Sequence, residues 1–516
     1  MRRVGVVILA AGKGTRMRSR YPKVTHRVGG RPMLEHVLRA AADAVSQDPT
    51  ETPDPGDGED HSPAFVVVVG HERDAVRQAV AWSPPDANLT YVIQEPQRGT
   101  GDAVRAARTS FAEAQNPETI LVLYGDTPLV RADTLRRLLI EHARTSAKVT
   151  FLTGLASAPT DYGRVLRDER GHVRGIVEKQ HATPDELAIP EVNSGIYCFE
   201  ASWLWSRLDR LTPHENGEYY LTDLVGLAIE EDRAVATTRV ALAETIGVND
   251  RVQLAEAEAL LRARTLRDLM IAGVTVEDPA TTYIEVGVRV GQDTVLRPGT
   301  MLHGTTSIGA DCVIGPNSII RDSQIGDNCE VIGSWLDSAV MESQSRIGPM
   351  SRLRPGARLR TGAFLGNFAE VKNATIGQGV RMHHFSFIGD ATVGAGTNIG
   401  AGTITCNYDG AQKNHTEIGE NVFLGCDTML VAPLTVGDSA ATGAGSVVTH
   451  DVAPGKLVAG VPARAIRRVG RNGQSPDHTT KGSSPAHPPE PPAAGGRDRS
   501  PQAGLASPAR QTGEKE

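Results

Sequence analysis

The sequence predicts an α/β domain followed by a solenoid of short β-strands. Residues 1–251 alternate strand-like and helix-like segments, which is typical of a mainly parallel sheet. Over residues 284–448 an aliphatic residue recurs about every six positions, a period that fits neither an α-helix nor a single half-buried strand. A strongly helical pattern at 254–272 separates the two. The predicted domains are therefore 1–251, a helical linker at 252–272, a solenoid at 273–470 and a tail at 471–516.

Four apolar runs predict the buried strands of the first domain, at residues 4–9, 64–69, 89–94 and 120–123. Helical patterns at residues 33–45, 73–81 and 101–113 lie between them. In such sheets, ligands gather at the carboxyl ends of the strands. Residues 47–63 interrupt the alternation with Pro, Gly and six acidic residues, which predicts a solvated insertion.

The repeat predicts short strands that each turn one aliphatic residue inward before the chain bends, often at Gly, as in Ile308-Gly309. An ordinary β-sandwich would not keep a six-residue register over so many steps. The aliphatic positions are Ile284, Val290, Leu296, Leu302, Ile308, Ile314, Ile320, Ile347, Leu353, Leu359, Leu365, Val371, Ile376, Met382, Ile388, Val393, Ile399, Ile418, Leu424, Leu430 and Val436.

The composition argues against several classes of function. A net charge of −7 offers no basic surface for nucleic acid. Five cysteines without a Cys-x-x-Cys motif indicate neither a disulfide framework nor a zinc ribbon. The apolar run at 4–11 ends in charged residues instead of a signal-peptide cleavage site, and no run approaches the ~20 residues of a membrane helix. We expect a cytoplasmic protein without membrane insertion, and a disordered tail at 471–516.

A loop of small residues, Leu9-Ala-Ala-Gly-Lys-Gly-Thr-Arg-Met17, directly follows the first predicted strand. Its small side chains would let backbone N–H groups approach a phosphate or a base closely. The loop lacks the ending of a Walker A motif, and alone it is equally compatible with a plain tight turn. Pro22-Lys23 and Tyr124-Gly125-Asp126 accompany it, the latter at the end of a buried strand.

Further motifs follow in a fixed order: Gln94 with Gly99-Thr100, Tyr162-Gly163-Arg164, Gly175-Ile-Val-Glu178, Val192-Asn193-Ser-Gly195, Glu218-Tyr-Tyr-Leu-Thr-Asp223 and Val248-Asn249. Together these motifs resemble the nucleotide-diphosphosugar pyrophosphorylases. More closely they resemble the family of bifunctional N-acetylglucosamine-1-phosphate uridylyltransferases/glucosamine-1-phosphate acetyltransferases. The resemblance covers residues 4–461 apart from the insertion. It implies a Rossmann-like nucleotidyltransferase domain followed by a left-handed parallel β-helix of hexapeptide repeats.

The resemblance implies two reactions. The carboxyl-terminal domain would acetylate glucosamine 1-phosphate with acetyl-CoA. The amino-terminal domain would then transfer UMP from UTP to N-acetylglucosamine 1-phosphate and release pyrophosphate. The family also implies a homotrimer, in which neighbouring subunits share the acetyl site, and a cytoplasmic role in peptidoglycan precursor synthesis.

Nucleotide transfer brings several negative charges together, so it needs charge neutralisation and positioning. By resemblance, Asp126 and Asn249 would bind Mg²⁺, which prefers oxygen ligands. Arg16 and Lys23 would hold the pyrophosphate and the transferring phosphoryl group. Gln94, Gly99 and Thr100 would read uracil, and Gly163, Glu178 and Asn193 would take the sugar. The remaining substrate contacts would come from Leu9, Ala10, Ala11, Gly12, Tyr124 and Gly125.

The repeat itself predicts a second site. Residues 353–371 make three uninterrupted six-residue steps, which is one coil of a three-sided helix. Arg354 and Lys372 each follow an inward residue, so they should stack about 4.8 Å apart. Two cations at that spacing repel by roughly 3–4 kcal/mol at an effective dielectric of 20. They either splay into water or hold an anion between them, and a sugar phosphate would fit.

By resemblance, His384 would be the general base that takes a proton from the amino group of glucosamine 1-phosphate. Residues 403–417 interrupt the six-residue repeat, and loops that interrupt a solenoid usually carry its binding groups. Phe387 should neighbour Glu370 beside the sugar. Further family positions for sugar and acetyl-CoA are matched by Asn398, Ala401, Asn407, Tyr408, Cys426 and Ala444.

Three positions depart from the family pattern. Phe387 stands where Tyr is common, Cys426 where Ser is common, and Val461 near a cofactor-binding Arg. These departures concern the second activity only. Three alternatives stay open: a monofunctional nucleotidyltransferase with a non-catalytic trimerising β-helix, a purely structural solenoid, and a metal-dependent lyase. In the last, His383, His384 and His415 could bind zinc across two subunits.

Overall fold

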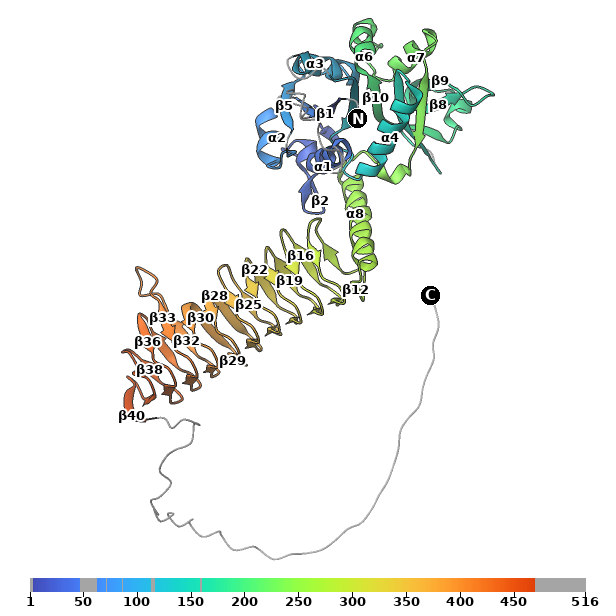
Figure 1. Ribbon diagram of the computed structural model, residues 1–516. Coiled ribbons are helices and arrows are strands. Elements are labelled where there is room, and N and C mark those ends of the chain that lie inside the picture. Colours follow the sequence, from blue (N-terminus) through green and yellow to red (C-terminus); the bar gives the residue numbers. More distant parts are fainter. Residues whose placement is uncertain are drawn as a thin grey trace, which may run out of the picture. The chain divides into compact units, whose positions relative to one another are not determined.

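A computed structural model describes residues 3–46, 63–70, 72–85, 87–112, 117–157 and 160–468 (Figure 1). All but one residue of the predicted insertion at 47–63 lies outside the described residues, as does the predicted disordered tail at 471–516. No helix in the described part of the chain is long and apolar enough to cross a membrane.

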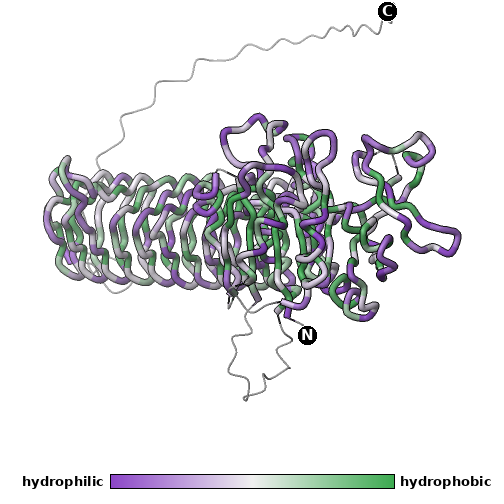
Figure 2. The backbone as a smooth tube through the Cα atoms, turned by 90° about the horizontal axis from the view of Figure 1, so that it is seen from above, coloured by the Kyte–Doolittle hydropathy of each residue, from purple (hydrophilic) through white to green (hydrophobic). Residues whose placement is uncertain are grey.

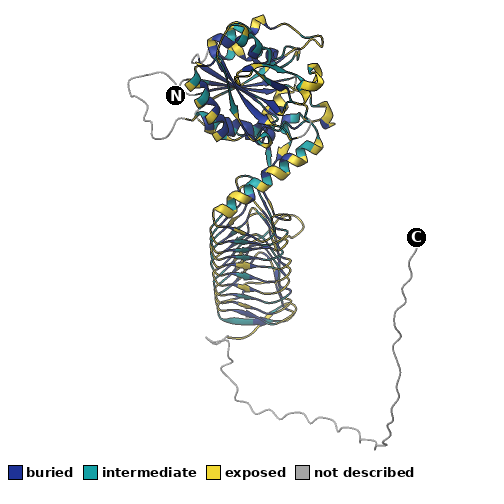
Figure 3. Cartoon of the chain, turned by 90° about the vertical axis from the view of Figure 1, so that its right-hand side faces the viewer, coloured by how far each residue is buried: buried dark blue, intermediate teal, exposed yellow. Residues whose placement is uncertain are grey.

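A nine-stranded sheet forms the centre of the first domain, in the order β11-β7-β10-β6-β1-β4-β5, with β8 and β9 attached through β10 (Figure 3). β1 runs parallel to β4 and β6, and β10 runs antiparallel to β6 and β7. The four predicted strands are found within one residue of their predicted ends. The strands are β1 (Val4–Ala10), β4 (Ala64–Val69), β5 (Asn88–Ile93), β6 (Thr119–Tyr124), β7 (Val149–Leu155), β8 (Arg164–Arg167), β9 (Val173–Val177), β10 (Glu191–Glu200) and β11 (Val235–Arg239).

Helices cover both faces of this sheet because successive side chains of a strand point to opposite faces. In β1, Val6 and Ile8 pack in a cluster with α1 and α4, whereas Val7 and Leu9 pack in a cluster with α3, α6 and α7. The predicted helix at 33–45 has its predicted ends. The helices are α1 (Met33–Val45), α2 (Arg73–Ala79), α3 (Thr100–Ala112), α4 (Ala132–Thr145), α5 (Pro184–Leu187), α6 (Ala201–Arg207) and α7 (Asp223–Glu230). A small hairpin, β2 (Arg27–Val28) with β3 (Arg31–Pro32), precedes α1.

The predicted linker helix is α8 (Arg251–Ile271), which begins three residues earlier than predicted. Asp250 caps it by accepting a hydrogen bond from the N–H of Gln253 at 2.9 Å, a polar N-cap that the apolar pattern does not reveal. Ala257 and Leu261 belong to a small core with residues of the first domain, and Leu266 belongs to the core of the repeat. One helix therefore contributes to two cores.

The repeat forms a parallel β-helix with three faces, in which each strand pairs in parallel with the strand of the next coil on the same face. The strands of the first face are β13 (Tyr283–Ile284), β16 (Met301–His303), β19 (Ile319–Arg321), β22 (Trp335–Asp337), β25 (Arg352–Leu353), β28 (Ala369–Ile376), β30 (Ser386–Val393), β32 (Ile404–Cys406), β35 (Met429–Val431) and β38 (Val447–Val448). β28 and β30 continue around a corner into the second face, whose other strands are β14 (Arg289–Val290), β17 (Ser307–Ile308), β20 (Gln324–Ile325), β23 (Val340–Met341), β26 (Arg358–Leu359), β33 (Thr416–Ile418) and β36 (Leu434–Val436).

The third face carries β12 (Thr275–Val276), β15 (Val295–Leu296), β18 (Val313–Ile314), β21 (Glu330–Val331), β24 (Arg346–Ile347), β27 (Phe364–Leu365), β29 (Arg381–Met382), β31 (Asn398–Ile399), β34 (Phe423–Leu424), β37 (Ala441–Thr442) and β39 (Lys456–Ala459), and ends with β40 (Arg464–Arg468). β40 turns back to pair antiparallel with β39 and closes this edge. Apolar and polar residues alternate at short intervals along the coils (Figure 2).

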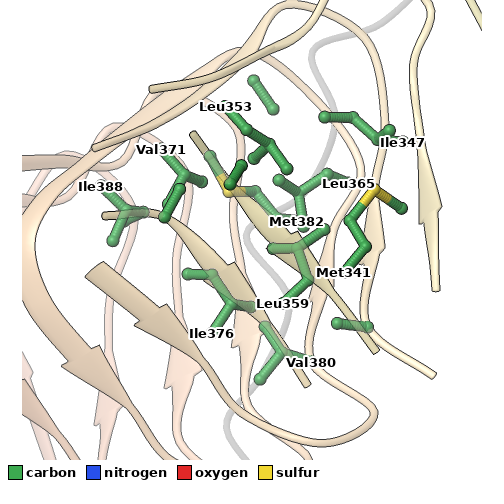
Figure 4. Packing of buried hydrophobic residues seen from close by; sticks show 14 of the residues in the cluster. Met341, Ile347, Leu353, Leu359, Leu365, Val371, Ile376, Val380, Met382 and Ile388 are labelled. Atoms are coloured by element: carbon green, nitrogen blue, oxygen red, sulfur yellow. The ribbon is translucent and has the colours of Figure 1, made fainter. Parts of the chain in front are cut away.

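The inward aliphatic residues form one continuous core, and Figure 4 shows them pointing toward one another. The predicted coil length is confirmed, because Leu353 pairs with Val371 and Leu365 with Met382. Of the predicted inward positions, Val290 is only partly buried. The gap between Ile320 and Ile347, where no inward residues were predicted, is filled by Ile325, Val331, Leu336 and Met341.

Small residues line the interior two positions before many of the inward residues. Their hydroxyl groups bond carbonyls of the next coil, as in Thr294 to Gly309 (2.8 Å). Cys312 and Cys329 take this position in two successive coils, and each thiol reaches a carbonyl at 3.1 to 3.6 Å. All five cysteines are free. The two in the β-helix core are thus explained by packing.

Candidate active sites

The loop after β1 opens into a cavity of about 1040 Å³ at the carboxyl ends of the parallel strands. Leu9 of β1 is in register with Tyr124 of β6, so the loops after both strands start side by side. The N–H of Gly125 donates to the carbonyl of Leu9 at 2.9 Å and joins the two strand ends. The chain after β5 is joined to the end of β4, the neighbour of β1, because the backbone N–H of Gln94 donates to the carbonyl of Val69 at 2.8 Å.

A lysine and two oxygen-bearing side chains meet in this cavity. Lys23 lies in the short helix η2 (Lys23–Thr25), where it forms an ion pair with Asp126 and donates to Oδ1 of Asn249 at 3.1 Å. The backbone carbonyl of Asp126 accepts from the N–H of Val248 at 2.9 Å, which ties the two loops together. Two oxygen atoms from different loops therefore converge on one cationic group.

Glu178 and Asn193 supply further polar groups to the wall. Burial raises the pKa of Glu178, although the Thr222 hydroxyl, which donates to the carboxylate at 3.3 Å, opposes the shift. The Asn193 amide nitrogen donates to the Tyr197 hydroxyl at 2.6 Å, and its oxygen accepts from the N–H of Gly195 at 3.1 Å. The protein thus holds these groups in fixed orientations.

Three cationic side chains gather on the β-helix. β25 and β28 pair in parallel register, so Arg354 and Lys372 stack in successive coils, as predicted. Lys413 reaches the same place from the irregular segment, and its contact lowers the pKa of Lys372 because two ammonium groups repel. Glu370 pairs with Arg354 at 2.9 Å and offsets only part of this charge. The cluster is suited to binding an anion.

Phe387 is in register with Glu370, as the repeat predicted. Its ring lies over Gly389 and beside Asn407, since a Cβ built on Gly389 would be 2.6 Å from Cζ of Phe387 and 3.0 Å from Nδ2 of Asn407. Asp390 accepts hydrogen bonds from Asn407 and from Asn373. Burial works to raise the pKa of Asp390, but these two donors outweigh it and lower the pKa. A carboxylate therefore stands next to the cation cluster.

His384 is exposed in the turn between β29 and β30. The neighbouring His383 packs edge-on against Phe364, with ring centroids 4.8 Å apart. The carbonyl of Phe385 accepts from the N–H of Gly402 at 2.7 Å, which ties the turn to the next coil. The imidazole of His384 is thus carried on a turn that is fixed on both sides.

The irregular segment at residues 407–414 folds back on itself. Tyr408 and Lys413 form an antiparallel bridge, and the N–H of Asn414 donates to the carbonyl of Asn407 at 2.7 Å. Asp409 accepts two backbone N–H hydrogen bonds of 2.8 Å inside the turn. This hairpin brings Lys413 to the cation cluster, which explains why the hexads stop here.

Three small side chains line up on successive coils. Each stands two residues after the end of its strand: Ala401 after β31, Cys426 after β34 and Ala444 after β37. The N–H of Asp427 donates to the carbonyl of Ala401 at 2.7 Å, and the N–H of Gly445 donates to that of Cys426 at 2.8 Å. The turns are stacked and present these small side chains in a row.

Comparison with known proteins bears on both parts of the chain. Residues 6–214 match the family model of the MobA-like NTP transferase domain, and residues 287–322 match that of the bacterial transferase hexapeptide (six repeats). The bifunctional protein GlmU of Trichlorobacter lovleyi is 45% identical over 454 residues, which cover 87% of this chain and 94% of that protein. The chain belongs to the GlmU family. GlmU of Kineococcus radiotolerans is 44% identical over 88% of this chain and 89% of its own length, and GlmU of Brevibacillus brevis is 41% identical over 91% and 97%.

Most residues predicted for nucleotide transfer line the cavity. They are Leu9, Ala10, Ala11, Gly12, Arg16, Lys23, Gln94, Gly99, Thr100, Tyr124, Asp126, Glu178, Asn193 and Asn249. Two predicted residues do not line it. Gly125 packs against Val24 and Ala10, and the carbonyl of Gly163 accepts from the N–H of Asn193 at 2.9 Å, so both glycines support the wall from behind.

Among the residues predicted to bind the sugar phosphate in the second site, one stands apart from the rest. Arg354, Lys372 and Phe387 belong to the first face of the β-helix, whereas Asn398 points outward from β31 on the third face. A single chain therefore does not bring Asn398 to the cation cluster.

Some residues at the two sites escaped prediction. Gln97 lines the cavity and donates to the carbonyl of Ala11 at 2.6 Å. Tyr220 also lines it and accepts hydrogen bonds from Gln180 at 2.6 Å and from Asn216 at 2.7 Å. Lys413 could have been found, because it is a cation within the segment already expected to carry binding groups. Tyr220 belongs to the motif Glu218-Tyr-Tyr-Leu-Thr-Asp223, but the resemblance implies no particular role for it.

The zinc alternative finds no support within one chain. Among the described residues, no group of three or more His, Cys, Asp or Glu side chains is arranged to hold a metal ion. His383 packs on Phe364, and His415 lies 3.2 Å from the hydroxyl of Thr392. Two of the three histidines that prompted this alternative, His383 and His415, thus have other neighbours.

Proposed function

We propose that the chain makes UDP-N-acetylglucosamine in two steps. It is a bifunctional transferase: it acetylates glucosamine 1-phosphate with acetyl-CoA and then transfers UMP from UTP to N-acetylglucosamine 1-phosphate with release of pyrophosphate. The observation that carries this function is the 45% identity to a bifunctional GlmU over 87% of the chain. We assign uridylyl transfer to residues 1–251 and acetyl transfer to residues 273–470, with α8 between them.

In the first reaction, the sugar phosphate would lie near Glu178 and Asn193, and the base near Gln94. Arg16 and Lys23 would neutralise the phosphates, because attack on the α-phosphorus gathers negative charge that needs preorganised cations. The convergence of the loops after β1, β5 and β6 supports this assignment, since it puts cationic and polar groups around one cavity.

Asp126 and Asn249 would hold Mg²⁺. Their oxygen atoms both contact the ammonium group of Lys23, so they already point at a common position, and oxygen donors suit this ion. When bound, Mg²⁺ supplies charge neutralisation at the phosphates.

In the second reaction, Arg354, Lys372 and Lys413 would bind the phosphate of glucosamine 1-phosphate. His384 would remove the proton from the amino group as that amine attacks the thioester of acetyl-CoA. Ala401, Cys426 and Ala444 would flank the cofactor, and Asn407 and Tyr408 would help to bind it. The stacked cations support this reading, since they would repel one another without an anion.

A homotrimer would complete the second site. Two groups of apolar side chains point outward from the first face of the β-helix: Tyr283, Met301, Ile319 and Trp335, and then Phe387, Ile404, Met429 and Val447. Contact between such faces would remove this apolar surface from water. It would also allow Asn398 of a neighbouring copy to reach the cation cluster that its own chain does not reach.

One experiment tests both reactions. The purified protein receives glucosamine 1-phosphate, acetyl-CoA, UTP and Mg²⁺, and UDP-N-acetylglucosamine, pyrophosphate and free CoA are measured. All three should appear. The substitutions at Phe387, Cys426 and Val461 favour one competing reading, in which the β-helix only assembles the enzyme. In that case N-acetylglucosamine 1-phosphate would yield product while glucosamine 1-phosphate released no CoA.

A further inference from the structure

Gln94 offers a single hydrogen-bonding group to the nucleotide cavity. Its amide nitrogen lies 3.0 Å from the carbonyl oxygen of Gly99 and 3.0 Å from Oδ2 of Asp102. Both neighbours are acceptors, so the NH₂ group has to face them and donates one hydrogen bond to each. Gln94 is almost fully buried and lines the cavity. It therefore presents its carbonyl oxygen, an acceptor, to whatever binds beside it.

The carboxylate behind Gln94 is itself fixed. Asp102 is 9% exposed and lies in the first turn of α3, outside the lining of the cavity. Its second oxygen, Oδ1, lies 3.4 Å from Nη1 of Arg105 and 3.6 Å from Nη2 of Arg98. Both guanidinium groups stand over the ring of Tyr219, at 5.0 Å and 5.6 Å from its centroid. One oxygen of Asp102 thus meets two cations, while the other is left to accept from Gln94.

The loop between Gln94 and Asp102 has little freedom. A Cβ on Gly99 would lie 2.6 Å from the carbonyl oxygen of Tyr219, and the φ angle of Gly99 is +94°. The N–H of Gly101 donates to that same carbonyl at 2.9 Å, and the hydroxyl of Thr100 accepts from the N–H of Leu221 at 3.0 Å. The carbonyl of Gly99 is held in place by these contacts, so the orientation of the Gln94 amide is set by two fixed acceptors.

We propose that Asp102 determines the selectivity for uracil over cytosine by fixing the amide of Gln94 with its oxygen toward the base. Uracil carries an N–H at N3, which the Gln94 oxygen can accept. Cytosine carries an unprotonated N3, which would face that oxygen lone pair to lone pair. Asp102 does not touch the nucleotide and is a positioning residue. The inference rests on the proposed function, which puts the base beside Gln94.

The variant D102N tests this mechanism with almost no change in size. Arg98 and Arg105 would attract the oxygen of the new amide, which turns its NH₂ group toward Gln94. Two NH₂ groups then oppose each other, and Gln94 loses its preference for one orientation. We expect the ratio of kcat/KM for UTP to kcat/KM for CTP to fall about 10- to 100-fold, the range for one mismatched base contact.

D209N is the matched control. Asp209 lies 3.6 Å from Nε of Arg105 and 3.0 Å from Nη1 of Arg108, so its substitution removes a carboxylate from the same arginine without touching Gln94. The UTP/CTP ratio should stay within about twofold of the parent. The double variant Q94A/D102N should show the same ratio as Q94A alone, because Asp102 acts only through Gln94.

The readouts separate this inference from the proposed function. A parent enzyme that forms no UDP-sugar from UTP would overturn both. A parent that prefers UTP, together with D102N losing UTP and CTP activity in equal proportion, would overturn the role of Asp102 alone. If circular dichroism finds D102N unfolded, D102S removes the carboxylate with a smaller side chain and should lower the same ratio. Calorimetric titration of UTP and CTP without sugar phosphate should report the loss in binding.

Discussion

Substituting Gly366 by alanine should damage the second site through the backbone that carries His384. Gly366 stacks on His383 of the next coil, and its N–H donates to the carbonyl of Met382 at 2.8 Å. A Cβ at Gly366 would lie 2.6 Å from the carbonyl carbon of His383, 2.9 Å from its Cα and closer still to its oxygen. All three are backbone atoms, so no side chain can rotate away.

The size of the effect follows from these distances. Restoring an ordinary contact of 3.4 Å to a carbonyl carbon at 2.6 Å requires a shift of 0.8 Å, and the closer oxygen requires more. His384 follows directly, so its imidazole would move by a comparable amount. A displacement of about 1 Å at a reacting group can lower the rate about 100-fold. The overpacking should also cost about 1–3 kcal/mol of stability.

The assay follows release of CoA from acetyl-CoA with glucosamine 1-phosphate, and uridylyl transfer serves as an internal reference. G362A is the matched control in the same coil, because a Cβ at Gly362 meets nothing within 4 Å. Its φ of +69° costs a non-glycine residue about 1–2 kcal/mol, so G362A also loses stability. Only G366A should lose acetyl transfer. Equal losses in both variants, or full acetyl transfer in G366A, would refute the reasoning.

Three further outcomes are expected. Asp126→Ala should abolish uridylyl transfer and spare acetyl transfer, and His384→Ala should do the reverse; a folded variant that loses both activities would contradict two separate sites. Phe387→Tyr should raise kcat/KM for glucosamine 1-phosphate about 10-fold, since a hydrogen bond to a charged group is worth about 1.5–3 kcal/mol and water replaces part of it; no gain would remove this residue from the sugar site. The hydrogen bond from Arg167 lowers the pKa of the Glu191 carboxyl below its usual value of 4.5. The stabilisation by this pair is therefore fully present above pH 4.5 and is lost as the pH falls through the lowered pKa. Arg167→Met should therefore lower Tm by about 2–4 °C at pH 7 and by less at pH 3.

The β-helix could be predicted from sequence because its core requires one aliphatic residue per strand. Leu353 and Val371 could be paired by counting, and the count also placed Arg354 over Lys372. Counting fails where coils shorten. Ile320 pairs with Leu336, which lies only sixteen residues later. Because this coil is shorter than eighteen residues, a six-residue count does not find the inward residues between Ile320 and Ile347.

The nucleotide cavity was predictable for a different reason. Its residues follow parallel strands that are themselves evident as apolar runs, and the carboxyl ends of those strands meet at one edge. The contact of Lys23 with Asp126 and Asn249 spans 103 and 226 residues, so no local pattern in the sequence encodes it. The sequence could name these three residues as neighbours of one ligand, but not as neighbours of one another.

The orientation of a side-chain amide is even harder to predict from a sequence. A sequence shows that Gln94 is a glutamine, and a glutamine offers both a donor and an acceptor. In the proposed mechanism, the group that faces the base is decided by a carboxylate eight residues away, by the carbonyl of Gly99, and by the arginines that hold the carboxylate in place. Base selectivity can therefore change through substitutions at Asp102 or Arg105 while every residue in contact with the nucleotide stays the same. GlmU proteins that differ at those two positions should differ in their tolerance of CTP, and the D102N and D209N pair measures how much of that tolerance the Gln94 amide controls.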